Sequence, residues 1–179
     1  LLGILASLTL GITFRKRPEV AHVDCARLID GDLDYTREIA RHRPTLVPGE
    51  LGWNCSSIKE RILPARNPDT GFPILYARIV NEDYDFLEDQ LATNYASENL
   101  YCFAVDKKAN KTFHDRFFEL EKCLPNVFVT KIERDMDSAG HNQNEAHLDC
   151  MNMTRDRRWE YAVLMQNHDV LIKTHNEMT

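Results

Sequence analysis

The chain has 179 residues, a hydrophobic content of 43% and a formal net charge of −6 at pH 7. These values fit one globular domain or an incomplete larger one, and the acidic balance argues against a general nucleic-acid-binding protein. Its five cysteines include no CxxC motif and no Cys/His pair at zinc-ligand spacing, which disfavours a zinc site.

The N-terminus is apolar: residues 1–14 read LLGILASLTLGITF and are followed by Arg15-Lys16-Arg17. We expect residues 1–20 to be a signal-anchor or the remnant of a signal peptide. The apolar stretch is short for a bilayer span, and a basic cluster on this side disfavours an anchor followed by a lumenal domain. A buried strand or helix is the alternative interpretation.

Residues 21–71 are predicted to form a stem region that packs back on the domain that follows. Apolar side chains recur near one face of residues 23–43, which predicts a helix, although Gly31 weakens its middle. Residues 43–69 contain four prolines and two glycines, so this part is predicted to be mostly irregular.

A strand–helix–strand pattern covers residues 72–106 and predicts the first βαβ unit of an open α/β sheet. The polar cluster Asn81-Glu82-Asp83 is expected to cap the helix of this unit. Strands and helices continue to alternate to the end of the chain, which predicts a mostly parallel sheet with flanking helices. The predicted strands are residues 73–80, 100–105, 126–130 and 161–166, and the predicted helices are residues 83–95, 112–122 and 144–155.

Polar residues end the first two predicted strands, in Val80-Asn81-Glu82 and in Asp106. Ligands of open α/β sheets collect at the carboxyl ends of the strands. A carboxylate at the position of Asp106 can accept hydrogen bonds from a ribose hydroxyl or a uracil N–H group; a helix cap or a solvated loop acid is an equal alternative. These residues indicate a nucleotide site.

Four motifs resemble one known family when they are taken in order: FPILYARIV, LYCFAVD, CLPNVFV and HDVLIKTHNEM. The chain is similar, from about residue 25 to its end, to the N-terminal, donor-binding part of the core-2/I-branching β-1,6-N-acetylglucosaminyltransferases. The resemblance implies that residues 72–179 are the nucleotide-sugar-binding half of a GT-A-like, Rossmann-like glycosyltransferase domain. It also implies inverting transfer of N-acetylglucosamine from UDP-GlcNAc to a glycan or glycoprotein acceptor, without a metal cofactor.

The resemblance assigns donor binding to particular residues: Val80, Asn81, Glu82, Asp106 and Ser138. The family's donor-binding aspartate follows a cysteine of the same strand by four residues, as Asp106 follows Cys102. Asn81-Glu82 replaces the usual His-His, and the negative charge of Glu82 near a diphosphate puts the identity of the donor in question. Ser138 replaces an aromatic residue, so a stacking contact is lost.

Some expected residues are absent or lie at the edge of the site. Asp169 corresponds to a residue that opens the acceptor side of the family's site. The catalytic base, a glutamate, and the basic pair that neutralises the diphosphate are expected downstream of Thr179, so no catalytic residue is assigned.

The turn over residues 133–142 offers two weaker candidates. The small residues after Ser138 let backbone N–H groups approach a ligand, although a plain surface loop explains them equally well. Asp135-Met136-Asp137 is a DxD pattern of the kind that holds a divalent cation against a diphosphate. Such patterns are common by chance in a chain with 28 acidic residues, and the family has no metal ligand here.

The cysteines and sequons point to an oxidising compartment. The resemblance implies disulfides between Cys55 and Cys123 and between Cys102 and Cys150, and leaves Cys25 with a partner that is missing from this chain. N-glycosylation sequons begin at Asn54, Asn110 and Asn152. Together these features favour the secretory pathway, and the family suggests a type II membrane protein with its domain in the Golgi lumen.

Three alternatives remain at this stage. One is a peptide O-xylosyltransferase-like enzyme, which would share the fold and use a different UDP-sugar. Another is a truncated, non-catalytic lumenal paralogue that binds nucleotide or glycan. A cytosolic nucleotide-binding α/β enzyme is disfavoured because the chain has no glycine-rich phosphate-binding loop.

Overall fold

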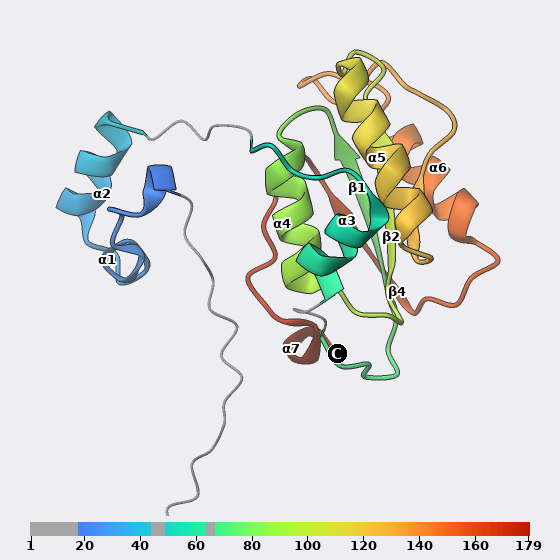
Figure 1. Cartoon of the computed structure of the whole chain (residues 1–179), viewed down its shortest axis with the longest axis horizontal. Coiled ribbons are helices and arrows are strands. Elements are labelled where there is room, and N and C mark those ends of the chain that lie inside the picture. Colours follow the sequence, from blue (N-terminus) through green and yellow to red (C-terminus); the bar gives the residue numbers. More distant parts are fainter. Residues whose placement is uncertain (1–17, 44–48, 64–66) are drawn as a thin grey trace, which may run out of the picture. The chain divides into compact units, whose positions relative to one another are not determined.

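The computed structural model describes residues 18–43, 49–63 and 67–179 (Figure 1). The chain separates into two compact units, residues 1–49 and residues 50–179. Residues 50–71, predicted as stem, therefore belong to the same unit as the sheet, and the division of the chain into stem and domain stays a prediction. Most of the predicted signal segment lies outside the described residues. Within the described ranges, no helix is long and apolar enough to cross a membrane.

The described part of the first unit contains three short helices. They are η1 (Pro18–Val20), α1 (Cys25–Ile29) and α2 (Leu33–Arg41). The prediction of one helix over residues 23–43 was wrong in its middle, because the chain turns at Gly31 with a φ of 79°, a left-handed conformation that glycine adopts without strain. Asp32 then begins α2 by accepting a hydrogen bond from the Tyr35 N–H group at 3.0 Å.

The second unit is an α/β structure around a four-stranded sheet. The strands are β1 (Ile74–Val80), β2 (Leu100–Val105), β3 (Val127–Val129) and β4 (Tyr161–Met165), and the helices are α3 (Cys55–Ile62), α4 (Tyr84–Asn94), α5 (Lys111–Cys123), α6 (Gln143–Thr154) and α7 (His175–Met178). The strand order is β3-β2-β1-β4, and every pair is parallel. The predicted α/β class is confirmed, and the arrangement is consistent with a GT-A-like fold.

The two faces of the sheet carry separate hydrophobic clusters. Every residue of β1 and β2 is buried, and successive side chains alternate between the faces. Helices α3, α4 and α5 cover one face, where Tyr76 and Phe103 pack with Phe117 (Figure 1). Helix α6 covers the other face, where Ala77 packs with Ala146. The strand ends between these two layers are thereby held in fixed positions.

Helix α3 lies in the stretch that was predicted to be mostly irregular. Asn54 caps it, because its Oδ1 atom accepts a hydrogen bond from the Ser57 N–H group at 3.0 Å. Ile58 and Ile62, one helical turn apart, are almost fully buried and attach the helix to the core. Prolines and glycines on both sides obscured this short amphipathic pattern.

The polar cluster before α4 does not cap the helix as predicted. Asp83 occupies the N-cap position with a φ of 59° and makes no side-chain cap hydrogen bond. Its carboxylate contacts the Nε2 atom of His168 at 2.7 Å instead. Helix α7, at the end of the chain, was not predicted; His175 anchors it, fully buried and 2.8 Å from a carboxylate oxygen of Glu98.

Both predicted disulfides are present. Cys55–Cys123 joins α3 to the end of α5 across 68 residues of sequence. Cys102–Cys150 joins β2 to α6 across 48 residues. Cys25 is exposed and has no disulfide partner among the described residues. The two bridges hold one helix on each face of the sheet.

Removal of the β2–α6 bridge should destabilise the second unit markedly. We expect the double variant C102S/C150S to lose about 2–4 kcal/mol of unfolding free energy, because the unfolded chain regains loop entropy. Urea unfolding of the oxidised protein measures this loss. C25S is the matched control and should leave the unfolding midpoint of this unit unchanged; an equal effect of both variants would contradict the assignment.

Candidate functional site

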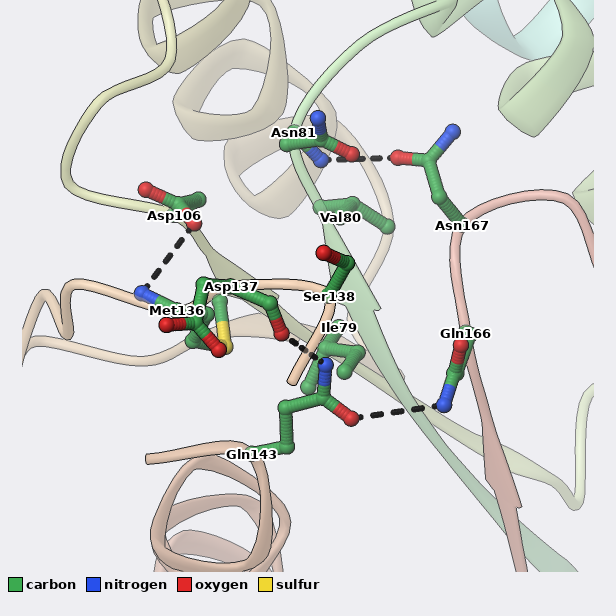
Figure 2. Close-up of a pocket in the computed structure, with 10 residues that line it drawn as sticks. All are labelled: Ile79, Val80, Asn81, Asp106, Met136, Asp137, Ser138, Gln143, Gln166 and Asn167. Carbon is green, nitrogen blue, oxygen red and sulfur yellow. Dashed lines mark hydrogen bonds between the residues drawn. The ribbon is translucent and has the colours of Figure 1, made fainter. Parts of the chain in front are cut away.

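A cavity of about 220 Å³ lies at the carboxyl ends of β1, β2 and β4 (Figure 2). It is the position at which open α/β sheets bind ligands. The segment between β3 and α6 closes it on one side. The lining residues are Ile79, Val80, Asn81, Asp106, Met136, Asp137, Ser138, Gln143, Gln166 and Asn167.

Asp106 connects three of the segments around the cavity. The residue is 4% exposed, so its carboxylate must be satisfied by the protein or by a ligand. One oxygen accepts the Lys108 N–H at 2.7 Å and the other accepts the Met136 N–H at 3.2 Å. The Asp106 N–H group donates to the Val80 carbonyl oxygen at 2.8 Å. Each carboxylate oxygen keeps a further lone pair with which to accept a hydrogen bond.

The two aspartates of the DxD pattern have separate basic partners. Asp135 pairs with the Lys108 ammonium group at 2.6 Å, and Asp137 pairs with the His141 imidazole at 2.7 Å. The buried side chain of Met136 lies between them in the sequence. The aspartates thus contribute to the conformation of the turn, and they do not form a joint ligand set in the structure.

Asn167 joins the ends of β1 and β4, and it was not predicted from the sequence as a site residue. Its Oδ1 atom accepts the N–H groups of Asn81 at 2.7 Å and Glu82 at 3.2 Å. Its Nδ2 group donates to the Glu82 carbonyl oxygen at 3.1 Å. Figure 2 shows the Asn167 side chain directed at Asn81. The rule of strand ends, applied to the last strand as well, would have identified it.

Two glutamines, also missed, connect the remaining sides of the cavity. The Nε2 group of Gln143, at the start of α6, donates to the Asp137 carbonyl oxygen at 2.7 Å. Gln166, at the end of β4, donates to the Oε1 atom of Gln143 at 3.3 Å. These bonds fix the turn over residues 135–138 against the sheet (Figure 2).

The structure brings together most of the residues predicted to bind the donor. Val80, Asn81, Asp106 and Ser138 line the cavity. Glu82 does not line it, and its exposed side chain lies at the beginning of the next loop. Asp169 also lies outside the lining, and its carboxylate accepts the Gln166 N–H at 2.7 Å.

The cavity lining combines apolar and polar groups and, among the described residues, contains no lysine or arginine. Apolar side chains of Ile79, Val80 and Met136 accompany amide, hydroxyl and carboxylate groups. This combination suits an uncharged heterocycle with hydroxyl groups better than a phosphate, because no lining cation offsets a phosphate charge.

One group of potential metal ligands occurs among the described residues. Ligand atoms of Glu82, Asp83 and His168 lie within 4.8 Å of one another, and all three residues are exposed. An exposed group of this kind, without a buried polar partner directed at it, does not establish a metal site.

Comparisons with known proteins give the context of this geometry. Residues 74–179 match the sequence model of the Core-2/I-Branching enzyme family. A β-1,3-galactosyl-O-glycosyl-glycoprotein β-1,6-N-acetylglucosaminyltransferase of Bos taurus is 26% identical over 92% of the chain and 42% of its own length. The enzyme of this name numbered 3, from Rattus norvegicus, is 30% identical over 90% of the chain and 40% of its own length. The Homo sapiens protein of the same name as the bovine one is 25% identical over 87% and 40%. The chain spans about two fifths of the length of these relatives.

The Asp137–His141 pair predicts a pH dependence of the turn beside the cavity. Its hydrogen bond raises the pKa of His141 above 6.5 and lowers the pKa of Asp137 below 3.8. The stabilisation of the turn is therefore complete between pH 3.8 and pH 6.5. It is lost as pH rises through the raised histidine pKa and as pH falls through the lowered aspartate pKa.

NMR titration of the His141 ring measures this effect. We expect a midpoint above 6.5 in the native protein and a return toward 6.5 in the D137N variant, which retains the shape of the side chain and removes its charge. Equal midpoints in the two proteins would show that the pair does not form in solution.

Proposed function

We propose, on the premise that this chain belongs to the Core-2/I-branching enzyme family, that it forms the donor-binding part of a branching glycosyltransferase. The whole protein would transfer N-acetylglucosamine from UDP-GlcNAc to a glycan or glycoprotein acceptor by inverting displacement. The chain covers about two fifths of its relatives, and the catalytic base is expected beyond Thr179.

One observation carries the proposal: four of the five residues that the family resemblance assigns to the donor line one cavity at the strand ends. In this proposal, the free lone pairs of the Asp106 carboxylate accept hydrogen bonds from a uracil N–H or a ribose hydroxyl group. The backbone after Val80, held in place by Asn167, contacts the nucleoside. Small residues at Ser138 and beyond leave room for backbone contact.

The donor sugar is proposed from the relatives. Those described above carry the name of β-1,6-N-acetylglucosaminyltransferases, which favours N-acetylglucosamine over the xylose of the alternative enzyme. Donor binding is proposed to be independent of a divalent cation, because the DxD carboxylates are paired with Lys108 and His141. A non-catalytic paralogue would share the donor site and lack transfer.

The proposed compartment is the Golgi lumen, reached by a type II membrane protein whose anchor would lie in residues 1–20. Two disulfides favour an oxidising compartment. The three sequon asparagines, Asn54, Asn110 and Asn152, are all exposed, so each is accessible to glycosylation.

Calorimetric titration with UDP tests the donor site. We expect the native protein to bind UDP with and without EDTA, and D106A to weaken binding at least tenfold because the uridine loses its acceptor. The UDP affinity of D106N, which keeps one acceptor oxygen, should lie between those of the native protein and D106A. D115A on α5 is the control, since Asp115 does not line the cavity and pairs with Lys111. Absence of UDP binding by the folded native protein would overturn the proposed function.

The charge of Glu82 should oppose donor binding. We expect E82Q to tighten UDP-GlcNAc binding about two- to fivefold at low ionic strength, because removal of an exposed carboxylate near the diphosphate lowers repulsion. This gain in UDP-GlcNAc affinity should be smaller at high salt, where exposed charges are screened.

E60Q on α3 removes an equivalent exposed carboxylate outside the cavity lining and should leave the affinity unchanged. Weaker binding by E82Q at both salt concentrations would instead indicate that Glu82 contacts the donor directly.

A further inference from the structure

Arg78 is a buried cation in the middle of an otherwise apolar strand. It lies in β1, is 5% exposed, and projects to the face covered by α4. One guanidinium nitrogen, Nη2, donates to the Asp169 carbonyl oxygen at 2.8 Å and contacts the Met165 sulfur at 3.4 Å. Both partners are neutral, and Arg78 forms no ion pair within the described part of the chain.

The positive charge of Arg78 persists in the folded protein. Burial lowers the pKa of its guanidinium to about 10, and the charge of Asp169 opposes this effect. The group is therefore still protonated at neutral pH. The Asp169 carboxylate itself accepts the Gln166 N–H, and its attraction does not restore an ordinary pKa. A buried charge without a bound counterion is costly.

A small cavity lies against Arg78, between the sheet and α4. Its volume is about 20 Å³, more than the roughly 10–15 Å³ that one water molecule needs, so the cavity has room for a single, slightly larger ion. The lining residues are Tyr76, Arg78, Leu87, Gln90, Leu91, Asn94, Tyr101, Phe103, Met165 and Leu171. Apart from Arg78, none of the described residues in the lining is charged.

Two further polar groups of this lining have no hydrogen-bond partner among the residues that the structure describes. They are the buried hydroxyl group of Tyr76 and the buried Oε1 atom of Gln90. Burial raises the pKa of Tyr76 to about 12, so its hydroxyl group remains a neutral donor. The Gln90 amide can turn by half a rotation and present its NH₂ group at the same place. The lining then offers N–H and O–H donors and a cation, without an anion.

We propose that this cavity binds one small inorganic anion of the size of chloride, held by Arg78, Tyr76 and Gln90. The anion neutralises the guanidinium and accepts the two unused donors, which a water molecule would do only in part because it brings no charge. The site lies on the α4 side of the sheet, apart from the cavity at the strand ends, and it does not depend on the proposed function.

Occupation of the site would stabilise the segment after β4. Arg78 holds the Asp169 carbonyl, and Asp169 closes the turn that begins at Gln166. Ligand binding to the folded state alone raises its stability in proportion to the logarithm of ligand concentration. Chloride should therefore raise the melting temperature, whereas gluconate is too large to enter the cavity.

Thermal unfolding in sodium chloride and in sodium gluconate at equal ionic strength tests the proposal. We expect chloride to raise the Tm by about 3 °C at ten times its dissociation constant. The R78M variant should lose the difference between the two salts, and Y76F should shift the chloride midpoint roughly tenfold upward. R155M is the matched control, because it removes an exposed arginine (74% side-chain exposure). It should retain the difference in Tm between the two salts.

Equal melting temperatures of the native protein in the two salts would overturn the proposal, as would a chloride effect that R78M retains. Crystals grown in sodium bromide give a direct measurement that does not require R78M to fold. An anomalous bromide peak within hydrogen-bond distance of Arg78 and Tyr76 supports the site, and a water molecule alone at that position contradicts it.

Discussion

The buried carboxylate of Asp106 is the constraint on which the candidate site depends. A carboxylate removed from water requires hydrogen bonds, and the chain supplies them from Lys108 and from Met136, which are separated by a long stretch of sequence. Because Met136 belongs to the segment after β3, satisfying this one group places that segment beside the end of β2, which is itself bonded to the end of β1. The cavity at the strand ends follows from this arrangement.

Asn167 completes the same arrangement from the other edge of the sheet. The side-chain oxygen of Asn167 accepts a hydrogen bond from the Asn81 N–H group, and its side-chain nitrogen donates one to the Glu82 carbonyl oxygen. The two disulfides then fix α3 and α6 on opposite faces, so the strand ends lie between rigid layers. Arg78 presents the reverse problem on the α4 face, where a buried cation has only neutral partners. The end of the sheet therefore carries a carboxylate, Asp106, that accepts hydrogen bonds from the backbone. Its middle carries a guanidinium group, Arg78, whose hydrogen-bond partners are neutral.

The sequence predicted the parts of the structure that depend on local pattern. Continuous apolar runs predicted β1 and β2. The rule that ligands bind at the carboxyl ends of the strands predicted Asn81 and Asp106 as site residues. The break at Gly31 requires a left-handed residue, which a periodicity over residues 23–43 does not reveal. Asn167 was within reach of the rule of strand ends, which was not applied to the last strand. Its bond to Asn81 and the bond of Gln166 to Gln143 could not be predicted, because they form only when β4 pairs with β1, far away in the chain. The disulfide pairs came from family resemblance, since spacing alone leaves several pairings open.

A nucleotide site at the strand ends is tested most directly by an NMR titration of the isotope-labelled chain with UDP. We expect the amide signals of Asn81, Glu82 and Met136 to shift together, because Asn167 and Asp106 hold these N–H groups around the cavity. The amides of Ser57 and Phe113, at the caps of α3 and α5, should stay unchanged. Shifts confined to those helices, or no shifts at saturating UDP, would contradict a nucleotide site at the strand ends.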